Sequence, residues 1–282
     1  GKGGGRLLWR GRAENMSADL VRQAAAALDS LRESNPLVHC IANHVTAADT
    51  ANMLLAAGAS PIMADDPAEC AEVTALAQAL SLNLGTPSPA KLKAMQLSAE
   101  EAAARGIPVV LDPVGAGLTR LRREFCAELR GVSAVRGNLS EIAYLAGLGG
   151  GERGVDSLSA ADPAETARTA ACRLGCVCAV TGAADFISDG TRTVSINGGS
   201  PLMRRITGAG CMTSALCAAF AAECGAFIGA VAGAAFMKIC AELAEERSAA
   251  RLGGFHAALF DAAGSLTARE FAQRAKITPL NG

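Results

Sequence analysis

The alternation of short apolar stretches with helical stretches constrains the fold of this chain more than any other feature. The apolar stretches show no polar–apolar alternation, and they are Leu37–Ile41 and residues 80–84, 107–111, 132–135 and 176–180. The stretches between them predict helices at Ala47–Ala57, Pro89–Arg105 and Leu139–Leu145. Strands that are apolar throughout and separated by helices indicate a parallel sheet covered on both faces. We therefore expect one α/β domain.

Two later segments refine this expectation. Asp189-Gly190 is a turn signal inside residues 186–196, which predicts a small antiparallel hairpin at the sheet edge. After the hairpin the sequence is helical almost to its end. Residues 215–237 are apolar enough to resemble a membrane span, but Glu223 interrupts them and Ala and Gly dominate. A buried helix pair split near Gly225 is the better interpretation.

Composition excludes several classes of protein. The 282 residues carry a net charge of -1, so nothing points to nucleic acid or to an anionic membrane surface. The ten cysteines lie in apolar runs, as reduced core thiols do, and predict a cytoplasmic protein. Cys172, Cys176 and Cys178 approach metal-ligand spacing, but a second ligand pair is missing. Residues 1–15, of which 1–12 are basic and glycine-rich, are expected to be a disordered extension or a remnant added for expression, before a single domain at 16–282.

Ligands of open parallel sheets bind beyond the carboxyl ends of the strands, so the polar residues that follow each strand are the candidates. They are Asn43, Asp112, Arg136, Asn138, Glu141, Thr181 and the turn at residues 208–211.

The turn Gly208-Ala209-Gly210-Cys211 precedes the long Ala-rich run. Gly-x-Gly at a helix start leaves backbone N–H groups free to bind an anion, phosphate above all. The positive end of the helix would favour the thiolate of Cys211. These four residues are therefore a candidate anion hole for phosphoryl transfer; the alternative is a simple glycine turn with a buried cysteine.

The remaining candidates also fit phosphoryl transfer. Asp112 and Glu141 could hold Mg²⁺, although Asp112 could be a plain turn residue and Glu141 the capping partner of Asn138. Arg136 could clamp phosphate oxygens, or form an exposed ion pair. Thr181 offers a hydroxyl at the same rim.

Three residues near the first strands have weaker signals. His39 or His44 could pair with Cys211 as in a His–Cys catalytic site. The alternative for His39 is a core histidine, because it falls inside a predicted strand. Met63 would ordinarily be a core residue. Its position after a short strand makes it a candidate for packing against a small ring.

The segments that carry these residues resemble hydroxyethylthiazole kinases of the ribokinase-like superfamily. The order and spacing of the motifs match from Pro36 to about Met212. They are Pro36-Leu-Val-His-Cys-Ile-Ala-Asn43, Asp49-Thr-Ala-Asn52, Gly58-Ala-Ser-Pro-Ile-Met-Ala-Asp-Asp-Pro67, Leu82-Asn-Leu-Gly-Thr86, Leu111-Asp-Pro-Val-Gly-Ala-Gly117, Arg136-Gly-Asn-Leu-Ser-Glu-Ile142, Gly154-Val-Asp-Ser157, Val180-Thr-Gly182, and Pro201-Leu-Met203 leading to Thr207–Cys211.

The resemblance implies a ribokinase-like three-layer sandwich and ATP-dependent phosphorylation of the hydroxyl of 4-methyl-5-(2-hydroxyethyl)thiazole, a step of thiamine salvage. It also implies a homotrimer with active sites between subunits. Residue by residue it implies the following roles: Cys211 catalytic; Gly208, Ala209, Gly210 and Cys211 the anion hole; Met63, Gly208 and Asn43 in contact with the thiazole alcohol; Arg136 and Thr181 in contact with ATP; Asp112 and Glu141 the Mg²⁺ ligands.

The chain departs from the family pattern at three places. Ala42 replaces a more usual threonine, Ala183 stands where glutamate is common, and Gly199-Ser200 replaces a commoner Gly-His. Ala183 leaves one acidic group fewer near the nucleotide.

Three other functions compete with this interpretation. A pyrimidine or pyridoxal kinase of the same fold would also carry Gly-x-Gly-Cys, but the segments around Met63 and Asn43 disfavour it. A same-fold hydro-lyase would carry aspartate in place of Cys211. A non-catalytic binding module would not be expected to keep Asp112, Arg136 and Glu141.

Overall fold

A computed structural model describes residues 3–148 and 162–280, with side chains from residue 14 onward. The described residues form a nine-stranded sheet of order β2-β1-β3-β4-β5-β6-β7-β8-β9. The strands are β1 (Leu37–Ile41), β2 (Ser60–Ile62), β3 (Ala79–Asn83), β4 (Val109–Asp112), β5 (Ala134–Asn138), β6 (Val177–Thr181), β7 (Asp185–Ser188), β8 (Thr193–Asn197) and β9 (Lys276–Leu280). β2 to β6 run parallel, whereas β7, β8 and β9 are antiparallel to their neighbours.

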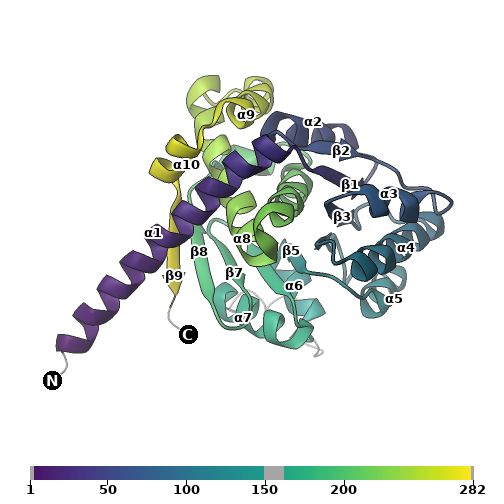
Figure 1. Cartoon of the computed structure of the whole chain (residues 1–282), viewed down its shortest axis with the longest axis horizontal. Coiled ribbons are helices and arrows are strands. Elements are labelled where there is room, and N and C mark those ends of the chain that lie inside the picture. The colour runs from purple at the N-terminus through teal and green to yellow at the C-terminus, as the bar shows by residue number, and fades with distance from the viewer. Residues whose placement is uncertain (1–2, 149–161, 281–282) are drawn as a thin grey trace.

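Helices cover both faces of this sheet, which makes the three-layer sandwich that the sequence predicted (Figure 1). They are α1 (Gly3–Ser34), α2 (Ala47–Ala57), α3 (Cys70–Leu76), α4 (Pro89–Arg105), α5 (Arg120–Glu128), α6 (Leu139–Leu145), α7 (Pro163–Leu174), α8 (Ala209–Ser248), α9 (Leu252–Ser265) and α10 (Ala268–Arg274), with a short 3-10 helix, η2 (Pro201–Arg205).

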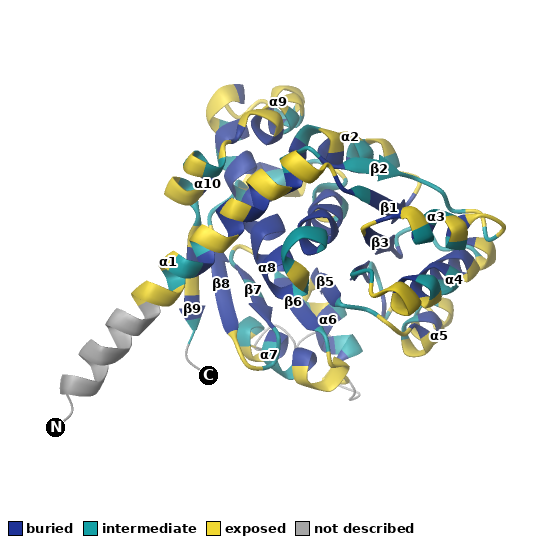
Figure 2. Ribbon diagram, viewed as in Figure 1, coloured by how far each residue is buried: buried dark blue, intermediate teal, exposed yellow. Residues whose placement is uncertain are grey.

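In each central strand, alternate side chains pack into two different hydrophobic cores, one on each face of the sheet. In β6, Val177 and Ala179 join the core shared with α1, α2, α8 and α9, whereas Cys178 and Val180 join the core shared with α4 to α7. Both faces are apolar because both are covered, which is why no polar–apolar alternation marks these strands. Figure 2 shows the buried residues concentrated in the strands and in α8.

The central helix α8 fills the middle of one layer and contacts β1 and β3 to β8. It is interrupted at Gly225, whose φ of 76° and ψ of 169° are not helical. The predicted split near Gly225 is thereby confirmed. Among the described residues this helix is long and apolar enough to cross a membrane, but 72% of its most apolar window is buried inside the protein, as in a core helix.

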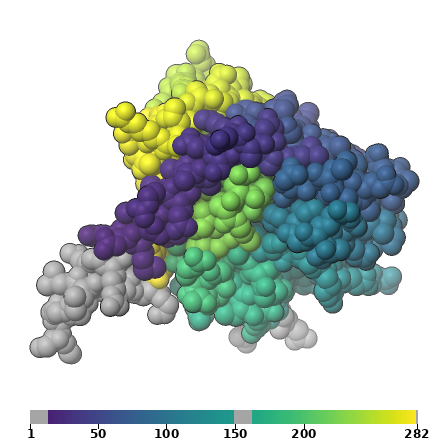
Figure 3. Space-filling model, in the orientation of Figure 1, coloured from purple at the N-terminus to yellow at the C-terminus, as the bar shows by residue number. Residues whose placement is uncertain are grey.

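The antiparallel part of the sheet is larger than the sequence predicted. β7 and β8 form the expected hairpin around Asp189-Gly190, but β9 adds a further strand and occupies the edge. β9 lies beside α1, and the hydroxyl of Ser17 donates to the carbonyl of Ile277 at 2.6 Å. The described part of α1 and the elements β9 and α10 are therefore neighbours although they are far apart in sequence (Figure 3).

Two sequence predictions are not tested by this arrangement. The expected boundary at residue 16 falls inside α1, and a separate extension at residues 1–15 stays a prediction. The family-like motif at residues 154–157 lies outside the described residues.

Candidate active site

The parallel strands bring the predicted site residues to one edge of the sheet. Asn83 ends β3 and pairs in register with Asp112, which ends β4. Asn138 of β5 likewise pairs with Thr181 of β6. Because parallel strands all end at the same side, residues far apart in sequence meet there.

The thiol of Cys211 is held by the side-chain amides of Asn43 and Asn83, which we call the amide pair. Asn43 donates from Nδ2 to the Cys211 sulfur at 3.2 Å and to Asn83 Oδ1 at 3.0 Å. The orientation of the Asn43 amide is determined because its Oδ1 accepts from the backbone N–H of Thr46 at 3.0 Å. The predicted substrate residue Asn43 thus lies against the predicted catalytic thiol.

The same chain of hydrogen bonds continues to the carboxylate of Asp112. Asn83 donates from Nδ2 to Asp112 Oδ2 at 3.0 Å, and Ser214 donates to the same oxygen at 3.0 Å. Arg136 Nη1 donates to Ser214 Oγ at 3.4 Å and to the carbonyl of Gly210 at 3.0 Å. The thiol of Cys211 and the carboxylate of Asp112 are therefore parts of one partly buried network of hydrogen bonds.

The charges in this network are set mainly by burial. Burial raises the pKa of Asp112 to about 6, and the positive charge of Arg136 and the Ser214 hydrogen bond oppose that rise. Burial, and then the charge of Asp112, also raise the pKa of Cys211, while hydrogen bonding by its neighbours lowers it. The sequence predicted that the helix end would favour the thiolate of Cys211. Burial and the Asp112 carboxylate act in the opposite direction on its pKa.

Glu141 has the capping role that was considered for it. Its Oε2 accepts from the Asn138 N–H at 2.8 Å while Asn138 caps the Glu141 N–H, a capping box at the start of α6. Its Oε1 accepts from the N–H of Gly115 at 2.9 Å. Its negative charge raises the pKa of Asp112, so the two carboxylates lie near each other. No group of three or more metal-binding side chains occurs within residues 14–148 and 162–280.

The Gly208–Cys211 turn forms the start of α8. Gly208 is the N-cap, with a φ of 84°, and no side chain caps the helix. A Cβ on Gly208 would lie 2.9 Å from Cγ2 of Thr46, so only glycine fits there. The buried hydroxyl of Thr46 has no hydrogen-bond partner in the described part of the chain.

A cavity of about 670 Å³ opens beside this helix start. It is lined by the predicted ATP residues Arg136 and Thr181, by Ala209 and Gly210 of the turn, and by Lys238. Lys238, nearly buried, donates to the carbonyls of Ala183 and Gly198 and lies 3.4 Å from Asp185. Met63, Asn43, Asp112, Glu141 and Cys211 are not among the lining residues, so the candidate site has a cavity side and a thiol side.

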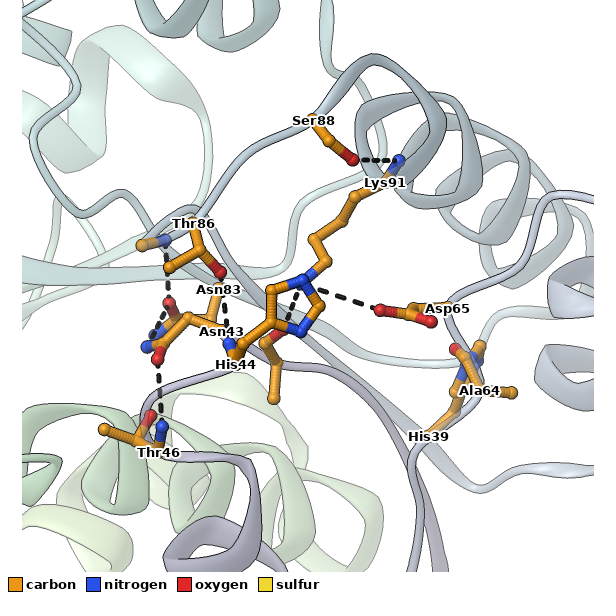
Figure 4. A network of polar contacts seen from close by, with 12 residues as sticks. His39, Asn43, His44, Thr46, Ala64, Asp65, Asn83, Thr86, Ser88 and Lys91 are labelled. Carbon is orange, nitrogen blue, oxygen red and sulfur yellow. Dashed lines mark hydrogen bonds and ion pairs between the residues drawn. The ribbon is translucent and has the colours of Figure 1, made fainter.

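The histidines and the Cys172 cluster do not make alternative sites. His39 bonds the hydroxyl of Thr74 at 2.8 Å and the carbonyl of Ala64 at 2.7 Å, and His44 faces Lys91 (Figure 4). Neither contacts Cys211. All ten cysteines lie in the described part of the chain and are free thiols.

Sequence reasoning missed four residues of this region: Asn83, Ser214, Lys91 and Lys238. Asn83 ends a predicted strand, so the rule that found Asp112 could have found it. Ser214 lies one helical turn after Cys211 and shares its face. Nothing in the pattern around Lys91 or Lys238 distinguishes them from ordinary helix lysines.

Comparison with known proteins decides the family. The chain matches the sequence profile of the hydroxyethylthiazole kinase family over residues 28–269. It is 41% identical over 275 residues to a hydroxyethylthiazole kinase of Ruminiclostridium cellulolyticum, covering 93% of this chain and all of that protein. It is 46% identical over 268 residues to one of Desulforudis audaxviator, covering 93% and 98%. This chain belongs to the hydroxyethylthiazole kinase family.

Solved structures agree with this family and show the wider fold. The hydroxyethylthiazole kinase of Pyrococcus horikoshii OT3 superposes with a TM-score of 0.84 at 37% identity, covering 92% of this chain and 99% of that one. The Staphylococcus aureus pyridoxal kinase in complex with ADP superposes with a TM-score of 0.54 at 14% identity, covering 73% and 87%. The second likeness is one of fold alone. It confirms the ribokinase-like architecture that the sequence predicted.

Proposed function

We propose that this protein transfers the γ-phosphoryl group of ATP to the hydroxyl of 4-methyl-5-(2-hydroxyethyl)thiazole. Membership of the hydroxyethylthiazole kinase family carries this proposal. The geometry supports it, because an uncapped helix start stands between a cavity lined by Arg136 and Thr181 and the partly buried thiol of Cys211. The competing pyrimidine and pyridoxal kinase functions have no specific observation in their favour.

ATP occupies the cavity side in this proposal. Arg136 and Thr181 contact the nucleotide, and the backbone N–H groups of Gly208 to Cys211 receive the charge that develops on the transferring phosphoryl group. Arg136 is already fixed by its hydrogen bonds to Gly210 and Ser214, so it needs little reorganisation on binding. Phosphoryl transfer depends mainly on positioning and charge stabilisation, which such a rigid frame provides.

The thiazole alcohol occupies the thiol side, against Met63, Asn43 and Gly208. Cys211, with its raised pKa, is a neutral thiol at rest and orients the hydroxyl rather than acting as a strong base. Asn43 holds the sulfur in place. Because a thiol of this kind contributes little basicity, turnover relies on the anion hole.

Asp112 and Glu141 are the proposed holders of Mg²⁺. Both offer the oxygen ligands that this ion prefers, and only Oδ2 of Asp112 is used in the hydrogen bonds of the described residues. When bound, Mg²⁺ neutralises phosphate charge on ATP. Glu141 keeps its capping bonds in this arrangement, so it would contribute through its remaining lone pairs or through a bound water.

A homotrimer with sites between subunits and a cytoplasmic location complete the proposal. Val45, Leu55 and Leu76 are large apolar side chains that are 69%, 59% and 69% exposed. They belong to α3, to α2 and to the segment before α2, the elements that flank edge strand β2 and the residues Asn43 and Met63. A neighbouring subunit on this side would cover them and complete the acceptor site.

The test is to identify the phosphate acceptor. The protein is incubated with Mg-ATP and equal concentrations of the thiazole, hydroxymethylpyrimidine and pyridoxal alcohols, and the phosphorylated products are separated by mass. We expect the thiazole phosphate to dominate. Preferential formation of either other phosphate, or no transfer to any of the three, contradicts the proposal.

A further inference from the structure

Lys91 is a buried cation in an unusual place. It lies in the first turn of α4, behind the N-cap Ser88, and is only 2% exposed. A positive charge is disfavoured at the N-terminal end of a helix, and burying an ammonium group costs free energy unless partners compensate. Helix stability therefore does not account for a lysine at this position.

The partners of the Lys91 ammonium come from two different loops (Figure 4). Nζ donates to the carbonyl of Ala42 at 2.7 Å and contacts Nε2 of His44 at 3.5 Å, both in the loop after β1. It lies 3.6 Å from Oδ2 of Asp65, in the loop after β2. An ammonium has three donors and no acceptor. One donor is used by the Ala42 carbonyl, while the His44 nitrogen and the Asp65 carboxylate lie at longer range. His44 Nε2 must be the acceptor of its contact.

These two loops carry the acceptor-side residues of the candidate site. Asn43 lies between Ala42 and His44 and donates to the Cys211 sulfur. Asp65 is two residues after Met63. Between them, the carbonyl of Ala64 is bonded by the buried His39. Lys91 thus connects the segment that contacts the thiol through Asn43 with the segment that carries Met63, and is not itself hydrogen-bonded to the thiol.

We propose that Lys91 is a positioning residue, whose ammonium holds the Ala42–His44 and Met63–Asp65 segments at the spacing that the acceptor alcohol needs. The proposal rests on the proposed function of the site, because it assigns the acceptor to this side. The cavity side is held by different groups, Lys238 with Asp185 and the carbonyls of Ala183 and Gly198. Loss of the Lys91 charge is therefore expected to weaken acceptor binding and to spare ATP binding.

The experiment compares Lys91→Met with wild type in steady-state kinetics, with the alcohol and ATP varied in turn. Lys91→Met keeps the length of the side chain and removes the charge. Lys93→Met makes the same change at an exposed position of the same helix and is the matched control. We expect the KM for the alcohol to rise about tenfold or more in Lys91→Met, with the KM for ATP within about twofold of wild type. Lys91→Arg is expected to recover part of the loss, and Lys93→Met to behave as wild type.

Asp65→Asn is the second variant, in case Lys91→Met does not fold. The Asp65 side chain is 43% exposed, so its substitution carries little risk for folding. We expect a rise of about threefold or more in the KM for the alcohol alone.

An unchanged KM for the alcohol in folded Lys91→Met, or a parallel rise in both KM values in either variant, overturns the positioning role. Failure of wild type to phosphorylate the thiazole alcohol instead contradicts the proposed function, and the comparison is then made with whichever alcohol it does phosphorylate.

Discussion

At the scale of single residues, the candidate site is a set of polar groups whose roles follow from their neighbours. Asn43 and Asn83 both have an amide oxygen that accepts from a backbone N–H, so their orientations are determined. As a result, their Nδ2 atoms face Cys211 and Asp112. The amide pair therefore fixes the Cys211 thiol and the Asp112 carboxylate relative to the ends of β1 and β3.

Removal of the thiol tests the role proposed for Cys211. We expect Cys211→Ala to lower kcat by about 10²-fold, the lower end of the range for acid–base and orienting groups, without abolishing turnover. The anion hole and Arg136 remain intact in this variant, which accounts for the residual rate. The measurement is single-turnover phosphoryl transfer together with thiazole binding by calorimetry. A rate equal to that of wild type contradicts the assigned role.

His39 is expected to make stability depend on pH. Burial lowers its pKa below the ordinary value of 6.5, so the unfolded chain binds the proton more readily than the folded one. Its contribution to stability is complete above pH 6.5 and is lost as the pH falls towards the folded-state pKa. The loss is at most about 1.4 kcal/mol for each pH unit.

Urea unfolding at pH 8.0 and at successively lower pH measures this dependence. His39→Gln, which keeps a donor and an acceptor but does not titrate, is the matched variant. We expect the free energy of unfolding to fall more steeply with decreasing pH in wild type than in His39→Gln. Equal slopes would show that His39 does not titrate differently in the folded and unfolded states.

At the scale of elements, α8 shows how one glycine shapes the core. Gly225 breaks the helix, and the halves on either side of it pack closely: a Cβ on Gly229 would lie 2.6 Å from the backbone of Ala221. With a φ of 76° and a ψ of 169°, this position suits glycine almost alone. A Cβ there would meet no atom within 4 Å, so the constraint lies in the backbone and not in the space available.

Gly225→Ala is therefore expected to destabilise the fold by about 1–3 kcal/mol. Gly253→Ala, at an exposed helical position of α9 with nothing within 4 Å, is the matched control. It is expected to be neutral or to stabilise by up to about 1 kcal/mol, because alanine is the better helix former. Thermal and urea unfolding measure both variants. Equal stability of the two would contradict the argument from backbone conformation.

At the scale of the whole molecule, three exposed apolar side chains, Val45, Leu55 and Leu76, lie on the surface of the elements around the proposed acceptor side. Leu55→Asp places a charge on α2 in that surface, and Leu174→Asp places one on α7, in the helix layer of the opposite sheet face. If subunits meet as proposed, we expect wild type and Leu174→Asp to sediment as trimers. Leu55→Asp should shift towards monomers and lose turnover. Sedimentation of wild type as a monomer contradicts the proposed assembly.

Much of the fold was predictable because local pattern and tertiary environment agree. Ala47–Ala57, Pro89–Arg105 and Leu139–Leu145 were predicted with the observed bounds. A side-chain N-cap marks the start of the second and third, and a glycine marks the end of the first and second. β9 was missed because it is a short edge strand containing Pro279, whose pairing with β8 is far away in sequence. Lys91 and Lys238 were missed because the sequence around a buried helix lysine does not differ from the sequence around a lysine on a solvated helix face.

The sequence by itself determined the class of fold, the family and the residues that follow each parallel strand. It could do so because apolar runs, caps and glycine turns act within a few residues of each other. Only the tertiary structure decided the state and connections of those residues. Burial, which depends on the whole fold, raises the pKa of Cys211 and of Asp112. The amide pair and the buried Lys91 depend on loops that meet only because parallel strands end together.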